Sequence, residues 1–282
     1  MKYTRLISRL DIKGPNLVKG VHMEGLRVLG KPENFAQYYY KNGIDELMYQ
    51  DVVASLYQRN SLLKIVEKTA SVISIPLTVG GGIRTIKDIS DLLESGADKV
   101  ALNTSAIKNP KLIEEAAKIF GSSTIVVAIE TSKDLNGNYL AYTDNGREFT
   151  GIEAVRWSKE VENRGAGEIF LTSIDKDGTG DGFDNNIINI ISDTVSIPVI
   201  AHGGAGNKDD VINVIKKGKA DAVVISSLLH YNALKQIKFN SSDELEGNFE
   251  FISKKKTFKK FGAMSVASLK KYLKKNKILV RI

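Results

Sequence analysis

The chain has 282 residues, of which 42% are hydrophobic and 26% charged, a balance typical of a globular protein with a sizeable core rather than a disordered chain. It has no cysteine and three histidines, so disulfides and thiolate metal sites are excluded and neither a metal nor a cofactor is expected. Much of the formal net charge of +7 lies near the C-terminus, in "KKKTFKKF" and "KKYLKKNK", which indicates a basic tail rather than a nucleic-acid surface.

From the N-terminus onward, "MKYTRLISRLDIKG" lacks the apolar stretch of a signal peptide, and no window is as apolar and long as a membrane span. We therefore expect a cytoplasmic protein without membrane contact. Short β-branched runs then alternate with helical patterns, and the latter are clear at 61–72, 86–96 and 209–218. The predicted strands are 5–12, 46–52, 76–79, 99–103, 124–130, 168–174, 198–202 and 222–227.

Eight strand-and-helix units predict a closed (β/α)₈ barrel of the α/β class, in a single domain over residues 1–282. One stretch departs from the alternation. A polar, lysine-rich segment at about 232–262 is longer than a barrel loop requires, and we interpret it as an insertion near the last helix.

The second half of the chain repeats the first. Segment 75–104 parallels segment 197–227 with one extra residue in the second copy, and each copy carries a glycine pair after a strand. In this correspondence Gly82 matches Gly204, and Asn103 and Thr104 match Ser226 and Ser227. A repeat of about half the chain length predicts a barrel built from two half-barrels.

Glycine corners after strands are typical of phosphate sites, because backbone N–H groups converge there with a helix N-terminus. The repeat therefore predicts a substrate with a phosphate at each end, although glycines also merely relieve crowding in tight turns. Lys19 lies in the first loop and could reach one phosphate, while Asp177 and Gly178 could line the loop after the sixth strand. The candidate phosphate residues at the corners are Gly82, Asn103, Thr104, Gly204, Ser226 and Ser227.

Two carboxylates occupy equivalent strand ends in the two halves. Asp11 closes the first strand and Glu130 the fifth, so the two should face each other over the barrel top. A single strand-end carboxylate is often only a loop cap. A pair on opposite sides of one substrate can divide the proton-donor and proton-acceptor roles, and we take both as catalytic candidates.

Four charged residues fall at strand starts, at the opposite end of the barrel: Arg5, Glu46, Lys99 and Glu168. If they point inward they must pair, since uncompensated buried charges are costly. Spacing alone favours a structural plug of ion pairs.

The motifs "RLDIKGPNLVKG", "TVGGGIR", "GADKVALNT", "GAGEIFLTSIDKDGT" and "HGGAG" resemble the cyclase subunit of imidazole glycerol phosphate synthase, the HisF family. The resemblance covers nearly the whole chain apart from about 232–262. It implies a barrel that takes ammonia from a glutaminase (HisH-type) partner in a heterodimer. The implied substrate is a bis-phosphorylated phosphoribulosyl-formimino aminoimidazole carboxamide ribonucleotide. The implied products are imidazole glycerol phosphate and the aminoimidazole carboxamide ribotide.

By resemblance, Asp11 matches a catalytic aspartate, and the glycine corners match the two phosphate pockets. The four strand-start charges match the gate through which the family admits ammonia. With this resemblance we favour an ammonia gate over a structural plug of ion pairs. Thr78 matches a tunnel-lining position, and Asp98 is expected near the contact with the partner.

Three positions depart from the family. Glu130 stands where the family has aspartate, Arg9 where it has a small residue, and His202 where it has serine. These changes, with the insertion, also resemble HisF-like paralogues that pass ammonia to a sugar amidotransferase in surface-polysaccharide synthesis, without cyclase activity. That alternative stays open, and a related isomerase is a weaker one because the gate charges would have no task.

Overall fold

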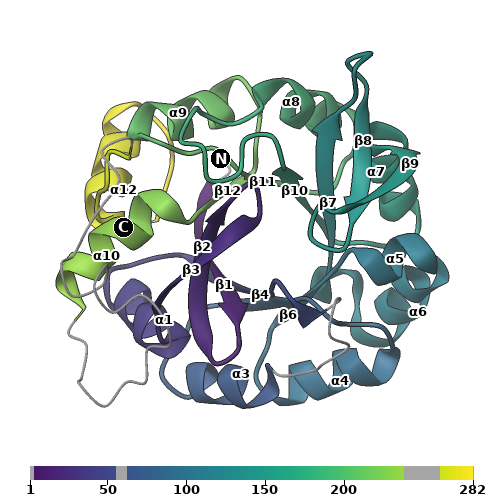
Figure 1. Cartoon of the computed structure of the whole chain (residues 1–282), viewed down its shortest axis with the longest axis horizontal. Helices are drawn as coiled ribbons and strands as arrows, with labels where there is room; N and C mark the ends of the chain where they lie inside the picture. The colour runs from purple at the N-terminus through teal and green to yellow at the C-terminus, as the bar shows by residue number, and fades with distance from the viewer. Residues whose placement is uncertain (1–2, 55–61, 238–260, 282) are drawn as a thin grey trace.

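Eight parallel strands close into a barrel in the computed structural model, which describes residues 3–54, 62–237 and 261–281 (Figure 1). The barrel closes because β1 pairs with β12 at one seam and β7 pairs with β10 at the other. The barrel strands are β1 (Arg5–Lys13), β4 (Glu46–Asp51), β5 (Leu77–Gly80), β6 (Lys99–Leu102), β7 (Ile125–Lys133), β10 (Glu168–Ser173), β11 (Val199–His202) and β12 (Ala222–Ile225). All eight predicted strands are confirmed within three residues at each end.

The helices surround the strands (Figure 1), as expected when each amphipathic helix buries one face against the sheet. Leu92 of α4 and Val214 of α9, for example, are fully or almost fully buried in this layer. The helices are α1 (Pro32–Lys41), α3 (Leu63–Ala70), α4 (Ile86–Glu94), α5 (Thr104–Lys108), α6 (Lys111–Phe120), α7 (Ala154–Asn163), α8 (Asn185–Thr194), α9 (Lys208–Lys216), α10 (Ser227–Gln236) and α12 (Val266–Lys275), with the short 3₁₀ turn η1 (Ser122–Thr124).

A second, smaller core fills the inside of the barrel. Successive residues of a strand point to opposite faces, so every second side chain points to the barrel axis. The inner apolar layer consists of Ile7, Met48, Ala101, Val126, Ala128, Phe170, Ile200, Ala222 and Val224, all of them buried. The barrel is therefore packed at mid-height, and polar inward side chains collect above and below this layer.

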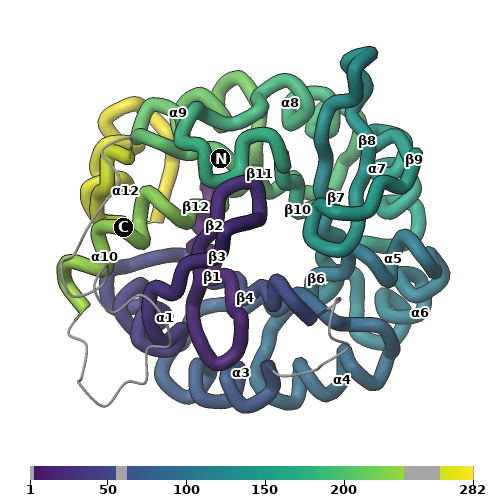
Figure 2. The backbone as a smooth tube through the Cα atoms, viewed as in Figure 1, coloured from purple at the N-terminus to yellow at the C-terminus, as the bar shows by residue number. Residues whose placement is uncertain are grey.

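Two antiparallel hairpins extend the barrel at its upper end, and the sequence pattern did not indicate them. The first, β2 (Asn16–Val21) and β3 (Glu24–Gly30), continues β1, and the second, β8 (Tyr139–Thr143) and β9 (Glu148–Glu153), continues β7. Figure 2 shows the first hairpin crossing the barrel mouth. Asn145 Nδ2 donates to Met23 O at 3.3 Å, so the hairpin tips meet above the barrel.

The two halves of the chain share this plan, because each begins with a strand that runs on into a hairpin. Most of the predicted insertion at 232–262 lies outside the described residues, and α10 continues to Gln236. Among the described helices, none combines the length and apolar character that crossing a membrane requires.

Candidate active site

The two glycine corners occupy equivalent places after β5 and β11. Gly81 and Gly203 have φ angles of 98° and 95°, in the left-handed region that favours glycine. A Cβ on Gly81 would also collide with the carbonyl oxygen of Asp51, and one on Gly204 with that of Gly182. Both corners therefore require glycine, because the backbone lies against the end of β4 at the first corner and against the loop after β10 at the second.

Each corner lines its own cavity. The first has a volume of about 210 Å³, and among its walls are Gly82, Asn103 and Thr104 together with Glu130. The second, of about 20 Å³, is lined by Gly204, Ser226 and Ser227 together with Lys19, Asp177 and Gly178. All six corner residues predicted from the repeat thus face cavities, three in each half.

The same cavities contain residues that sequence reasoning missed. Arg84 and Lys108 line the first cavity and add positive charge to it. Arg84 lies two residues beyond Gly82. Lys108 follows Thr104 by four residues, a spacing that places two side chains on one helix face. That spacing could have identified Lys108 from the sequence.

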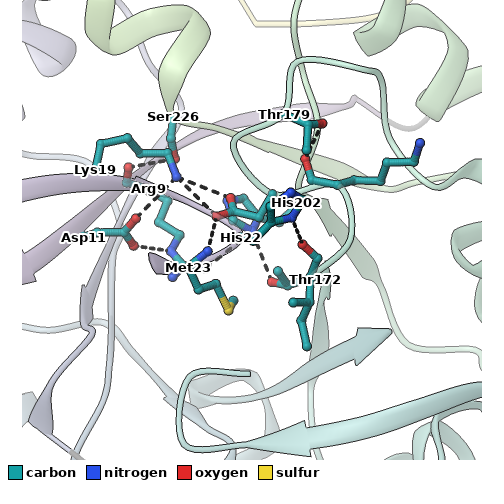
Figure 3. A network of polar contacts seen from close by, with 12 residues as sticks. Arg9, Asp11, Lys19, His22, Met23, Thr172, Thr179, His202 and Ser226 are labelled. Atoms are coloured by element: carbon teal, nitrogen blue, oxygen red, sulfur yellow. Dashed lines mark hydrogen bonds and ion pairs between the residues drawn. The ribbon is translucent and has the colours of Figure 1, made fainter. Parts of the chain in front are cut away.

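Next to the second cavity, which Lys19 and Asp177 line, lies a buried network of ion pairs around Asp11 (Figure 3). Arg9 Nε is 2.6 Å from Asp11 Oδ1, and Lys19 Nζ is 3.8 Å from Asp11 Oδ2. Lys19 Nζ also lies 3.3 Å from both carboxylate oxygens of Asp177. Each of these four residues is at most 5% exposed. Two cations and two anions therefore compensate one another out of contact with bulk water.

Asp177 attaches the first hairpin to the loop after β10. Its carboxylate accepts from Met23 N at 3.3 Å, and its carbonyl accepts from His22 N at 2.8 Å. Burial by itself would raise the pKa of Asp177, but the nearby cations, foremost Lys19, hold that pKa at about 2. Asp177 is thus a permanent anion that organises the hairpin and Lys19.

Glu130 is in a different electrostatic state. It is 6% exposed, and its Oε2 accepts from Gly146 N at 2.8 Å in the second hairpin. Burial raises the pKa of Glu130 to about 7, while Arg9 and the Gly146 N–H partly oppose that shift. A carboxyl group that titrates near neutral pH can both donate and accept protons.

His202 completes the network on β11. Its Nδ1 lies 3.1 Å from Thr172 Oγ1 and 3.4 Å from Arg9 Nη1, and its ring centroid is 5.3 Å from that of Phe170. Burial, and then the charge of Arg9, lowers the pKa of His202 well below its usual value. His202 is therefore a neutral side chain that packs beside Arg9.

At the lower end of the barrel the four strand-start charges form a closed ring. Arg5 lies 2.8 Å from both Glu46 and Glu168, and Lys99 lies 3.1 Å from Glu168 and 3.6 Å from Glu46. The expectation that inward charges must pair is met by an alternation of sign around the ring. Thr78 is 7% exposed and lies opposite Lys99 in the β5–β6 register, immediately above the ring.

Asp98 is exposed at the lower end of the barrel and has a structural partner there. Its Oδ2 accepts from Leu77 N at 2.8 Å, as Asp221 Oδ2 accepts from Val199 N at 2.7 Å in the other half. Both aspartates therefore fix the start of the neighbouring strand. No cluster of metal-ligating side chains occurs within the described ranges.

The architecture and the duplicated corners define a class of protein: a (β/α)₈ barrel of two half-barrels with a buried pair of carboxylates. Comparison with known proteins is consistent with this class, since a family model described as "Histidine biosynthesis protein" matches residues 5–235.

Several individual proteins are similar to this chain over most of its length. A protein of Legionella pneumophila named imidazole glycerol phosphate synthase subunit HisF is 56% identical over 210 residues, which cover 74% of this chain and 99% of that protein. HisF subunits of Natranaerobius thermophilus and Methanococcus vannielii are 47% and 45% identical, and the alignments cover 83% and 80% of this chain and 94% and 91% of those proteins. The chain belongs to the HisF family.

Proposed function

We propose that the chain is the cyclase subunit of an imidazole glycerol phosphate synthase and acts in histidine biosynthesis. It uses ammonia to convert the bis-phosphorylated formimino ribonucleotide into imidazole glycerol phosphate and aminoimidazole carboxamide ribotide. The observation that carries this proposal is the pair of matched glycine corners, each lining a cavity, with Glu130 in the wall of the first and the ion-pair network of Asp11 next to the second. A substrate with a phosphate at each end fits such a duplicated site.

Asp11 and Glu130 share the proton transfers of ring closure and cleavage. Glu130, with a pKa of about 7, can exchange a proton at neutral pH, and Asp11 Oδ2 has Lys19 Nζ at 3.8 Å, beyond hydrogen-bond distance. The corners with Gly82 and Gly204 hold the phosphates through backbone N–H groups. Lys19 contributes charge to the second phosphate, and Asp177 and Gly178 shape its pocket.

The relatives are named as subunits, which supports a complex with a second protein. We propose a heterodimer in which a glutaminase docks on the lower face of the barrel beside Asp98. Ammonia then enters through the ring that contains Arg5 and Lys99, and passes Thr78 on its way to the carboxylates.

The direct test supplies the purified chain with the bis-phosphorylated substrate and an ammonium salt, and follows release of the carboxamide ribotide. Turnover that is lost in Asp11→Asn, with substrate binding retained, supports the proposal. Tight substrate binding without turnover in the natural chain rejects it.

One observation favours a second function, conduction of ammonia to a separate sugar amidotransferase. Glu130 is one methylene longer than the aspartate of the resembled family, which displaces its carboxylate. If Glu130→Asp creates cyclase turnover where the natural chain has none, the conducting function gains. Rescue of a histidine auxotroph by the natural chain eliminates it.

A further inference from the structure

Arg9 is a buried cation at the centre of the site, and the function proposed above gives it no role. It is 2% exposed and points from β1 to the barrel axis, above the apolar layer. Its guanidinium carbon lies 5.7 Å from the centroid of the Phe170 ring, which supports it from below. A guanidinium buried this deeply requires anionic partners, so its placement depends on the carboxylates beside it.

The contact between Arg9 and Asp11 treats the two oxygens of the carboxylate differently. Arg9 Nε donates to Oδ1 at 2.6 Å, a short charge-assisted bond that restricts rotation of the carboxylate. The nearest cation to Oδ2 is Lys19 at 3.8 Å, beyond hydrogen-bond distance. One oxygen of Asp11 is held by a short bond, and the other has only the longer ion pair with Lys19.

The charge of Arg9 also reaches the opposite carboxylate. Arg9 opposes the rise in the pKa of Glu130 that burial causes. The titratable groups around the guanidinium come from every neighbouring element: Asp11 on its own strand, Lys19 on β2, Glu130 on β7, Asp177 after β10 and His202 on β11. His202 is neutral and Lys19 pairs with Asp177 and Asp11, so Arg9 is the cation whose charge reaches both Asp11 and Glu130.

We propose that Arg9 is a positioning residue that links the two candidate catalytic carboxylates. It fixes Asp11 through Oδ1 with Oδ2 directed to substrate, and it supplies the positive charge that Asp11 and Glu130 share. This inference rests on the proposed cyclase function. It assigns to Arg9 a task that the small residue of the resembled family could not perform.

The test compares Arg9→Met with Arg9→Lys in the full chain. Methionine keeps a flexible apolar stem above Phe170 and removes the charge, whereas lysine keeps the charge without the guanidinium fork. We expect Arg9→Met to lower kcat about 10- to 100-fold, because a misplaced carboxylate loses its geometry, with KM for the substrate changed less than threefold. The acidic limb of its pH profile should move to higher pH. Arg9→Lys should recover part of kcat and restore the natural pH midpoint.

The matched control is Arg164→Met, which removes an ion-paired arginine of the outer layer beside Glu160 and should change neither kcat nor the pH midpoint. If Arg9→Met turns over as fast as the natural chain or faster, Arg9 obstructs the site and the inference is wrong.

A second measurement separates this inference from the proposed function. Titration of ¹³C-labelled glutamate by NMR, with Glu130 assigned from Glu130→Gln, needs no turnover. The Glu130 midpoint should lie near pH 7 in the natural chain and higher in Arg9→Met, with Arg9→Lys near the natural value. If the natural chain lacks cyclase turnover, the proposed function fails while this shift still tests Arg9. An unchanged midpoint in Arg9→Met contradicts the inference alone.

Discussion

Thr85 and Asn207 perform the same task in the two halves of the barrel. Thr85 caps α4 in a reciprocal pair of hydrogen bonds with Asp88, and Asn207 caps α9 in the same way with Asp210. Each cap lies three residues beyond the second glycine of its corner. The internal repeat therefore extends from the amino-acid sequence to the capping hydrogen bonds. These bonds fix the direction of the helix that follows each corner.

Glu130→Gln should change how stability depends on pH. Because burial raises the pKa of Glu130 from 4.5 to about 7, the folded state binds its proton more tightly than the unfolded state. This group is fully protonated in both states at low pH, and its contribution to stability falls as pH rises from about 4.5 to 7, by up to ~3 kcal/mol. Urea unfolding at several pH values should show this decline in the natural chain and its loss in Glu130→Gln. Parallel curves for the two proteins would contradict the expectation.

Asp177→Asn should destabilise the protein by about 3–5 kcal/mol at pH 7, because Lys19 would lose its nearest anion while buried. The pKa of Asp177 lies at about 2, so this stabilisation is present at neutral pH and is lost as pH falls from 3.8 towards 2. The control Asp193→Asn breaks an exposed pair with Lys219 and should cost at most about 1 kcal/mol. Chemical denaturation measures both, and equal losses would show that Asp177 has no special role.

Gly204→Ala should damage the second phosphate corner. The added Cβ would meet the carbonyl oxygen of Gly182, and the φ of 112° is itself unfavourable for alanine. Gly43→Ala is the matched control, since Gly43 has a φ of 77° and nothing near its would-be Cβ. The control should lose only ~1–2 kcal/mol, while Gly204→Ala should also weaken substrate binding at least about tenfold. Calorimetric titration with the substrate measures the binding affinity of both variants. Unaltered binding by Gly204→Ala would show that this corner does not contact the substrate.

Lys99→Met should affect turnover with ammonia from a glutaminase partner more than turnover with a free ammonium salt. The change leaves Glu46 and Glu168 with Arg5 as their shared cation and opens one side of the ring. Turnover that depends on glutamine and a glutaminase partner should change several-fold, whereas turnover with a free ammonium salt should change less than twofold. A proportional change in both rates would mean that the ring has no part in delivery.

The sequence pattern predicted the barrel well for a physical reason. Strands that are buried on both sides form short apolar runs, and these stand out against the longer helical periods of the outer layer. The second hairpin was missed although Asn136-Gly137 and Asn145-Gly146 are strong turn signals, because its strands were interpreted as part of a barrel loop. The first hairpin turns at His22 and Met23, where the sequence has no such signal.

The candidate site was predicted only in part. The repeat identified the glycine corners and the carboxylates, because these lie at fixed offsets from strand ends. The pairing of Arg9 with His202 joins residues 193 positions apart, and its geometry depends on how the barrel closes. The separate cavities at the two corners likewise depend on tertiary packing, which no local pattern encodes.

The ring at the base of the barrel has a consequence for what can cross it. The positive charges of Arg5 and Lys99 balance the negative charges of its two glutamates, and each charge lies between two of opposite sign. The ring therefore presents no net charge to a small neutral molecule, whereas an ion must exchange its hydration for partners that are already paired. Under the function proposed above, the ring would be a charge filter that favours ammonia over ammonium by the cost of breaking an ion pair rather than by size.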